Sequence, residues 1–220
     1  MDELKISTLF TLENTIAADL MKRADMPWEI LPLIKDYITE LGSRLSADYE
    51  KKGENIWIHK SAKVAPSASI TGPCIIDENA EIRHCAFIRG SAIVGKGAVV
   101  GNSTELKNVV LFDKVQVPHY NYVGDSILGF RSHMGAGSIT SNVKSDKTLV
   151  VIKYKDEKIE TGLKKMGAIL GDNVEVGCGS ILNPGSVIGP GTNIYPLSSV
   201  RGYVPAGSIY KKQGEVAQKQ

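Results

Sequence analysis

The 220-residue sequence has little of what marks disulfide-rich, metal-binding or membrane proteins. Its three cysteines, Cys74, Cys85 and Cys178, are an odd number and form no CxxC motif. We therefore expect reduced thiols and no structural metal. No apolar run approaches the roughly 20 residues of a membrane-spanning helix, and the first residues are acidic. These absences predict a cytoplasmic protein with neither a signal peptide nor a membrane segment.

Aromatic residues and an excess of one charge are also scarce. Phe, Trp and Tyr make up 6% of the chain, whereas 22 residues are glycine, which favours a fold with many turns and an aliphatic core. The net charge of +2 gives no reason to expect nucleic acid or an anionic membrane as a partner. Any anion-binding site must therefore be a local cluster of basic side chains.

The sequence does have a six-residue repeat. Large aliphatic residues occupy every sixth position in two tracts: Val64, Ile70, Ile76, Ile82, Ile88, Val94, Val100 and Leu106, then Leu170, Val176, Leu182, Ile188, Ile194 and Val200. A period of six is neither helical nor a simple strand alternation, so each unit must be a short strand and a turn. Three units would close one triangular coil, with the aliphatic residues inside and Gly or Asn at the corners.

The repeat predicts an all-β solenoid, a left-handed parallel β-helix, over residues 56–208. A short middle tract, Tyr122, Leu128 and Met134, continues it. The repeat fails at about 141–169, where 148–154 and 159–163 flank a polar turn and predict a hairpin that projects from the coils. Residues 209–220 would form a carboxy-terminal tail. An ordinary β-sandwich of alternating strands is the competing fold.

Residues 1–55 precede the repeat and form a predicted helical segment, with helical periodicity over 10–48. A second helix in this segment has one apolar face, made by Ile30, Leu33, Ile34, Tyr37, Ile38 and Leu41. Either Pro27 or Pro32 would lie in its first turn, where the missing N–H is harmless. We expect these helices to cover the open strand edge of the first coil.

The stretch where the repeat falters carries motifs of a known family. The motifs are 88–92 (IRGSA), 100–107 (VGNSTELK), 119–125 (HYNYVGD) and 135–142 (GAGSITSN). Together they resemble the acetyltransferase domain of the bacterial bifunctional enzyme that acetylates glucosamine-1-phosphate and then attaches uridylate. This resemblance implies an N-acetyltransferase that uses acetyl-CoA as co-substrate and assembles as a homotrimer.

The resemblance also implies roles for the charged residues of the motifs. His119 would be the general base, because a neutral imidazole can take a proton from the sugar amine. Arg89 and Lys107 are 18 residues apart, one full coil, so they would stack into a cradle for a sugar phosphate. Glu105 would lie in the same substrate site and orient the imidazole. The alternatives are that Arg89 and Lys107 are ordinary solvated surface charges and that His119 is a loop histidine with no catalytic role.

Three more residues, Tyr122, His133 and Asn142, are implied to contact the acceptor. Tyr122 has a competing interpretation as an inward-facing residue of the middle tract. His133 stands where the family has an asparagine, and Val143 replaces a tyrosine that touches the acceptor. These departures leave acyl transfer as the expected reaction and leave the acceptor open.

Acetyl-CoA would lie along the second tract of the repeat. The residues implied to contact it are Gly135, Ala136, Cys178, Pro196, Lys211 and Lys212. The N–H groups of Gly135 and Ala136 would stabilise the thioester oxyanion. Lys211 and Lys212 have the alternative of belonging only to a charged tail.

The expected acceptor is an amino-sugar phosphate, in the first instance glucosamine-1-phosphate, and a nucleotide-linked amino sugar is the alternative. No Gly-rich nucleotide loop is present in the sequence, so nucleotidyl transfer would need another protein. A non-catalytic scaffold or regulatory subunit of a sugar-nucleotide enzyme is a second alternative. A carbonic anhydrase on the same fold would need three histidine ligands to zinc. The spacing of His59, His84, His119 and His133 does not fit one, so no metal is expected.

Overall fold

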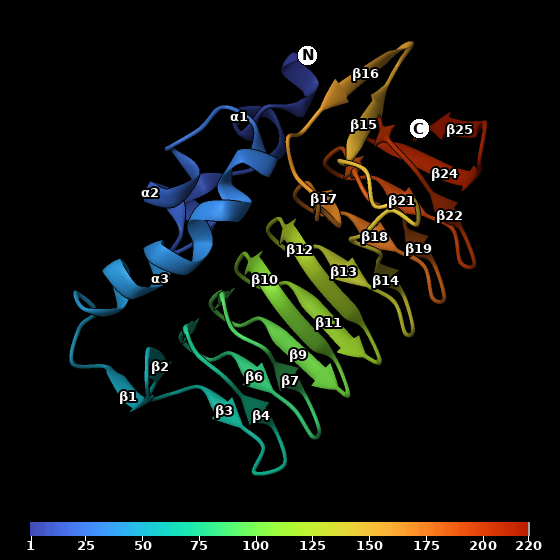
Figure 1. Cartoon of the computed structure of the whole chain (residues 1–220). Helices are drawn as coiled ribbons and strands as arrows, with labels where there is room; N and C mark the ends of the chain where they lie inside the picture. The colour runs from blue at the N-terminus through green and yellow to red at the C-terminus, as the bar shows by residue number, and fades with distance from the viewer. Residues whose placement is uncertain (220) are drawn as a thin grey trace.

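The computed structural model describes residues 1–219 and is a left-handed parallel β-helix, which confirms the predicted fold class (Figure 1). Strands of successive coils pair in parallel and lie 16 to 18 residues apart, as in the pairs Ile82↔Val100, Val100↔Val117 and Asn193↔Ile209. Across the insertion the separation is 42 residues, as in Met134↔Val176. Within the described residues, one face of the coils is a nine-stranded sheet, and a 14-stranded sheet forms the other two faces.

The nine-stranded sheet contains β3 (Lys63–Val64), β6 (Glu81–Ile82), β9 (Val99–Asn102), β11 (Gln116–His119), β13 (His133–Met134), β18 (Glu175–Val176), β21 (Asn193–Ile194), β24 (Ser208–Lys212) and β25 (Glu215–Gln218). The 14-stranded sheet contains β1 (Tyr49–Gly53), β2 (Ile56–His59), β4 (Ser69–Ile70), β5 (Cys74–Ile76), β7 (Phe87–Ile88), β8 (Ala92–Val94), β10 (Glu105–Leu111), β12 (Tyr122–Leu128), β14 (Ile139–Thr140), β17 (Ala168–Leu170), β19 (Ile181–Leu182), β20 (Ser186–Ile188), β22 (Ser199–Val200) and β23 (Tyr203–Val204).

The predicted aliphatic positions line the interior of the coils. Those from 76 to 106 and from 170 to 200 are all buried. Burial of such side chains provides the main favourable free energy for stacking the coils. Val64, in the first coil, is 36% exposed because no further coil covers it on that side.

The six-residue repeat loses one residue at two successive corners. Leu106 pairs with Ile88 and Leu111 with Val94, so the step between inward residues there is five. At these two corners a single residue with positive φ makes the turn, Asn108 at 55° and then, one coil later, Asp125 at 48°. Asn and Asp tolerate this conformation better than other non-glycine residues. Strands β10 and β12 therefore run through the corner as seven-residue strands.

The shortened corner changes which residue of the middle tract faces inward. Val123 pairs with Leu106 and is fully buried, so Val123 is the inward residue of that coil. Tyr122 lies on the outer side and is only partly buried. The interpretation of Tyr122 as an inward-facing residue is therefore wrong, because it continued a period of six across a step of five.

The amino-terminal segment is built of short helices along one side of the solenoid (Figure 1). They are η1 (Asp2–Leu4), α1 (Ile6–Leu9), η2 (Leu12–Asn14), α2 (Ala18–Met21), η3 (Pro27–Leu33) and α3 (Ile34–Gly42). Pro27 starts η3, and Pro32 lies in the last turn before α3. No helix among the described residues has both the length and the hydropathy needed to cross a membrane.

The expectation that these helices cover the first coil is wrong. They pack along the side of the coils instead, from Trp57 of β2, which lies against Gly42, to Asp172, which accepts from the N–H of Thr11 at 2.7 Å. Between these contacts, Asn108 donates to the carbonyl of Leu31 at 3.2 Å. The open edge is covered by strand β1, which pairs antiparallel with β2. The predicted helical segment 1–55 is therefore too long, because its helices end at Gly42 and Tyr49–Gly53 forms β1.

The insertion leaves the coil after β14 and returns to it at β17. It contains the predicted hairpin, β15 (Val151–Tyr154) and β16 (Glu157–Glu160), which pair antiparallel. The hairpin projects from the coils (Figure 1), and its first strand, β15, contacts β20 and β23. Gly202 permits this contact, because a Cβ atom there would lie 2.5 Å from the carbonyl oxygen of Lys153. The predicted tail also has structure, since β24 and β25 form a second antiparallel hairpin.

Candidate functional site

Six residues lie in line at the corner that joins the nine-stranded sheet to the next face. They are His84, Asn102, His119, Ala136, Cys178 and Pro196, and we call them the His119 column. The carbonyl of each of the first five accepts a backbone N–H from the next coil, at 2.9–3.2 Å, as Gly137 donates to His119 at 3.0 Å. The predicted base therefore lies one coil from Ala136, which belongs to the predicted coenzyme site.

The strands that follow this corner form one narrow outer face, and a second line of residues lies at their other end. Its members are Arg89, Lys107, Gly124, Ser141, Asn183 and Arg201, which follow from the pairing of β7, β10, β12, β14, β19 and β22. We call them the Lys107 column. The two columns border one narrow outer face, and Arg89 and Lys107 stack on adjacent coils as the spacing predicts.

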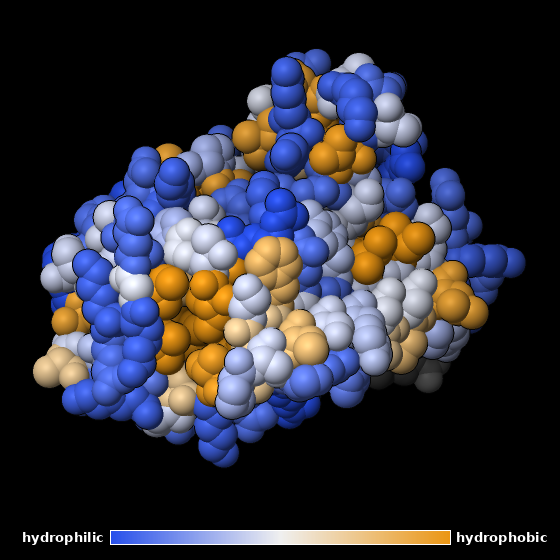
Figure 2. Space-filling view, turned by 60° about the horizontal axis from the view of Figure 1, so that its bottom comes forward, coloured by the Kyte–Doolittle hydropathy of each residue, from blue (hydrophilic) through white to orange (hydrophobic). Residues whose placement is uncertain are grey.

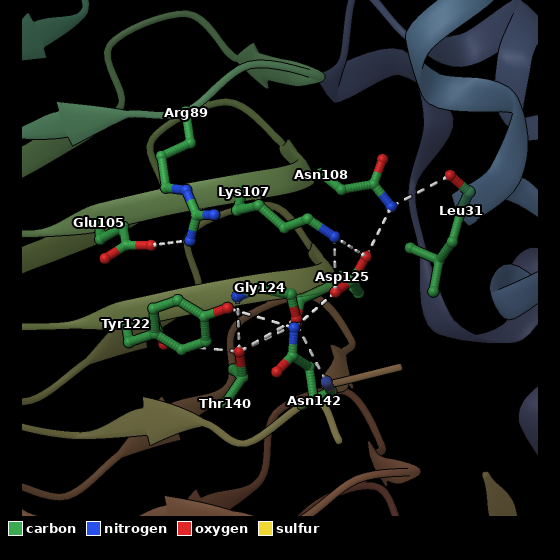
Figure 3. A network of polar contacts seen from close by, with 12 residues as sticks. Leu31, Arg89, Glu105, Lys107, Asn108, Tyr122, Gly124, Asp125, Thr140 and Asn142 are labelled. Carbon is green, nitrogen blue, oxygen red and sulfur yellow. Dashed lines mark hydrogen bonds and ion pairs between the residues drawn. The ribbon is translucent and has the colours of Figure 1, made fainter. Parts of the chain in front are cut away.

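Asp125 is the centre of a polar cluster beside the Lys107 column (Figure 3). Its side chain is 5% exposed and accepts from the Lys107 ammonium at 2.8 and 3.1 Å. It also accepts from Asn108 at 3.0 Å and from Asn142 at 2.5 Å. A buried carboxylate needs such donors, because its desolvation is otherwise costly. Lys107 is therefore already paired within the chain.

Tyr122 and Asn142 extend the cluster onto the outer face. The Asn142 amide donates to the Tyr122 hydroxyl at 3.2 Å, so both predicted acceptor residues meet Asp125 (Figure 3). Burial, and then the negative charge of Asp125, raise the pKa of Tyr122. Gly124 makes room for the ring, since a Cβ atom there would lie 2.5 Å from the Tyr122 hydroxyl.

Arg89 is paired as well. Its guanidinium donates to the Glu105 carboxylate at 2.7 Å, and this hydrogen bond raises the pKa of Arg89. The expectation that Glu105 orients the His119 ring is not met, because Glu105 points to Arg89 (Figure 3). Within residues 1–219 the His119 imidazole makes no hydrogen bond, and its backbone N–H donates to Asn121 at 3.0 Å.

The predicted oxyanion donors differ in their availability. The N–H of Gly135 donates to the carbonyl of Val176 at 2.7 Å, so it cannot also bind a thioester oxygen. That part of the prediction is wrong, because the chain uses this N–H to stack two coils. Among the described residues, the N–H of Ala136 has no such partner.

Three predicted residues lie away from both columns. His133 is on β13 of the nine-stranded sheet, where its ring meets the Glu175 carboxylate at 2.8 Å. Lys211 and Lys212 are on β24 and lie 3.6 and 3.4 Å from the Glu215 carboxylate. Within one chain, therefore, these side chains do not join the cluster around Asp125.

Sequence reasoning missed the central position of Asp125 and the basic residues of the insertion. Only the Gly124-Asp125 pair in the third motif gave a signal for the former. Three or more His, Cys, Asp or Glu side chains come together nowhere in residues 1–219 in a way that could hold a metal ion.

The fold and the two columns define a hexapeptide-repeat β-helix protein with a polar site on its outer face. The family model described as "GMPPB C-terminal domain" matches residues 70–195, more than half of the chain. The chain belongs to this family.

Relatives with known names confirm the resemblance that the motifs indicate. The "Bifunctional protein GlmU" of Methanococcus maripaludis is 31% identical over 177 residues, which cover 72% of this chain and 39% of that protein. A "Bifunctional sugar-1-phosphate nucleotidylyltransferase/acetyltransferase" of Sulfurisphaera tokodaii is 27% identical and matches 96% of this chain and 57% of its own length. The chain thus spans about two fifths of the first of these relatives.

Among the solved structures to which the chain is similar is the GDP-perosamine N-acetyltransferase of Caulobacter crescentus. It is 21% identical, the match covers 70% of this chain and 51% of that one, and the TM-score is 0.28.

Proposed function

We propose that the chain transfers the acetyl group of acetyl-CoA to the amino group of a phosphorylated amino sugar. The observation that supports this most is the position of His119 in one column with Ala136 and Cys178, across a narrow face from Tyr122 and Asn142. The named relatives support the same reaction class.

In this proposal His119 accepts a proton from the sugar ammonium, and the free amine attacks the thioester carbonyl. A carbon–nitrogen bond forms, and the oxyanion is stabilised by the N–H of Ala136. The carbon–sulfur bond then breaks, the imidazolium gives its proton to the departing thiolate, and the remaining extra proton on the amide nitrogen is released to solvent. Asn142 and Tyr122 orient the acceptor, and Asp125 fixes Asn142.

Two acceptors are candidates. Glucosamine-1-phosphate follows from the motifs, and the Sulfurisphaera relative is named for a sugar 1-phosphate. A nucleotide-linked amino sugar is favoured by the pairing of Arg89 and Lys107 with carboxylates, since these cations would have to exchange partners to bind a phosphate.

A homotrimer remains part of the proposal. Exposed apolar side chains occur on the strands and corners of the coils, among them Phe87 at 39%, Ile181 at 42% and Leu197 at 85%. Figure 2 shows apolar patches separated by hydrophilic side chains on one such face. A second copy could cover them. Sedimentation equilibrium tests this, and a monomer at all concentrations would argue against a shared site.

The reaction is tested by measuring thiol release from acetyl-CoA with a panel of amino-sugar phosphates and nucleotide-linked amino sugars. We expect His119→Ala to lower the rate by about 10²–10⁴-fold. His84→Ala is the matched control, because His84 lies in the same column outside the motif and bonds to Ser67. A wild-type protein that is inactive with every acceptor would support the scaffold alternative instead.

A further inference from the structure

A pocket of about 500 Å³ lies between the insertion and the later coils. The hairpin contributes Lys153 and Lys158 to its wall, the loop before the hairpin contributes Lys144 and Asp146, and the coils contribute Arg201. This volume is in the range of small-molecule sites, about 300–1,000 Å³. With four cationic side chains and one carboxylate, the lining has a net charge of +3.

Three of the four basic residues of this pocket, Lys153, Lys158 and Arg201, have no carboxylate partner among the described residues. Lys153 and Lys158 are directly opposite each other in the hairpin, a position where like charges are destabilising. Within residues 1–219 no carboxylate lies within 4.0 Å of either ammonium or of the Arg201 guanidinium. Only Lys144 has an acidic partner, Asp146, at 3.3 Å. An anion in the pocket would remove this repulsion.

The pocket walls are held in place before any ligand binds. Gly202 lets the backbone of Lys153 approach the coil, and Lys155, next along the hairpin, forms an ion pair with Glu3 at 3.0 Å. Arg201 donates to Asn183 at 3.3 Å. The backbone of Lys153 and the Arg201 guanidinium are therefore positioned before binding, which lowers the conformational entropy that binding costs.

The pocket adjoins the proposed acceptor site. Ser141 and Val143 line it, and Asn142 between them binds Tyr122 and Asp125. Ser141 and Arg201 also belong to the Lys107 column, whereas three of the proposed coenzyme residues, Ala136, Cys178 and Pro196, belong to the His119 column.

We propose that this pocket binds the diphosphate of a nucleotide-linked amino sugar, with the sugar directed toward Asn142. This inference rests on the proposed function and names its substrate class. The diphosphate diester of such a sugar carries two negative charges. The pocket lining, with a net charge of +3, can neutralise them, whereas Arg89 and Lys107 are already paired with carboxylates. Guanidinium and ammonium groups are the usual donors to phosphate oxygens.

Titration calorimetry of the full chain with UDP, in the absence of acetyl-CoA, tests the pocket. We expect Arg201→Gln to weaken UDP binding about tenfold, and Lys153→Gln with Lys158→Gln to weaken it at least as much. Arg201→Lys should recover part of the affinity. Lys164→Gln with Lys165→Gln is the control, because these lysines belong to the same insertion but do not line the pocket. Thermal unfolding of each variant shows that it is folded.

Each other outcome overturns the inference. Equal UDP affinity in the wild type and the pocket variants would show that the diphosphate binds elsewhere. Weaker binding of coenzyme A with unchanged UDP binding would assign the pocket to the coenzyme. If inorganic phosphate competes as strongly as UDP, the pocket recognises a single phosphate group and not a diphosphate. Because binding is measured without catalysis, inactivity toward all acceptors would refute the proposed function while leaving the UDP result to be judged alone.

Discussion

The two groups of basic residues near the Lys107 column differ in what neutralises them. Lys107 meets a buried carboxylate and Arg89 a half-buried one, whereas Lys153, Lys158 and Arg201 meet none among the described residues. In the first group, Lys107 therefore neutralises the buried carboxylate at a corner where the coils lose a residue. The second group has no carboxylate partner among the described residues, which leaves its charges available to an anionic ligand. A basic residue in a family motif is therefore not by itself evidence of an anion site.

The largest expected effect is a loss in the free energy of unfolding when the ion pair between Lys107 and Asp125 is removed. Lys107→Met leaves the Asp125 carboxylate buried without its charged partner, so we expect a loss of about 2 kcal/mol in the free energy of unfolding. Arg201→Met should cost less than about 0.5 kcal/mol, since that side chain has no ion pair. Urea unfolding of both variants measures the difference. Equal losses would remove the distinction between the two groups.

The next effect tests whether the hairpin is docked so that its lysines face the coils. Gly202 has a φ of 80°, and a Cβ atom there would strike the Lys153 carbonyl. We expect Gly202→Ala to cost about 1–3 kcal/mol and to speed amide hydrogen exchange in β15. Gly214→Ala is the control, because Gly214 has a φ of 81° and nothing within 4 Å. Exchange in β15 that is equal in the two variants would contradict the docking.

A smaller effect is expected when Arg89 is released from its partner. Glu105→Gln removes the carboxylate that neutralises Arg89, so binding of glucosamine-1-phosphate should tighten about threefold if the phosphate reaches this cation. Calorimetry measures the affinity. Glu175→Gln, which releases His133 on another face, serves as the control. No change in Glu105→Gln would leave Arg89 with a structural role only.

The smallest effect concerns the titration of Tyr122. Its pKa is raised above the ordinary value of 10.0 by burial and by Asp125. The native state therefore holds the phenolic proton more tightly than the unfolded chain. This stabilisation is complete below pH 10 and is lost as the pH rises through the native pKa. Wild-type stability should fall more steeply above pH 10 than that of Tyr122→Phe, and parallel curves from urea unfolding would argue against the shift.

Much of the fold follows from the sequence, and the site follows in part. The aliphatic positions identify the β-helix, and the spacing of Arg89 and Lys107 identifies their stacking. The partners of these cations do not follow, since Asp125 reaches Lys107 only because its own corner is one residue short. The same five-residue step explains why a period of six did not predict the outward position of Tyr122.

The sequence by itself determined the solenoid and the stacking of its coils, because a period of six places the same kind of side chain in the same environment in every coil. Only the tertiary structure decided which cations are neutralised and where the insertion packs. Those outcomes depend on contacts between residues in different coils, such as Lys107 with Asp125 and Lys153 with Gly202, which no local pattern encodes.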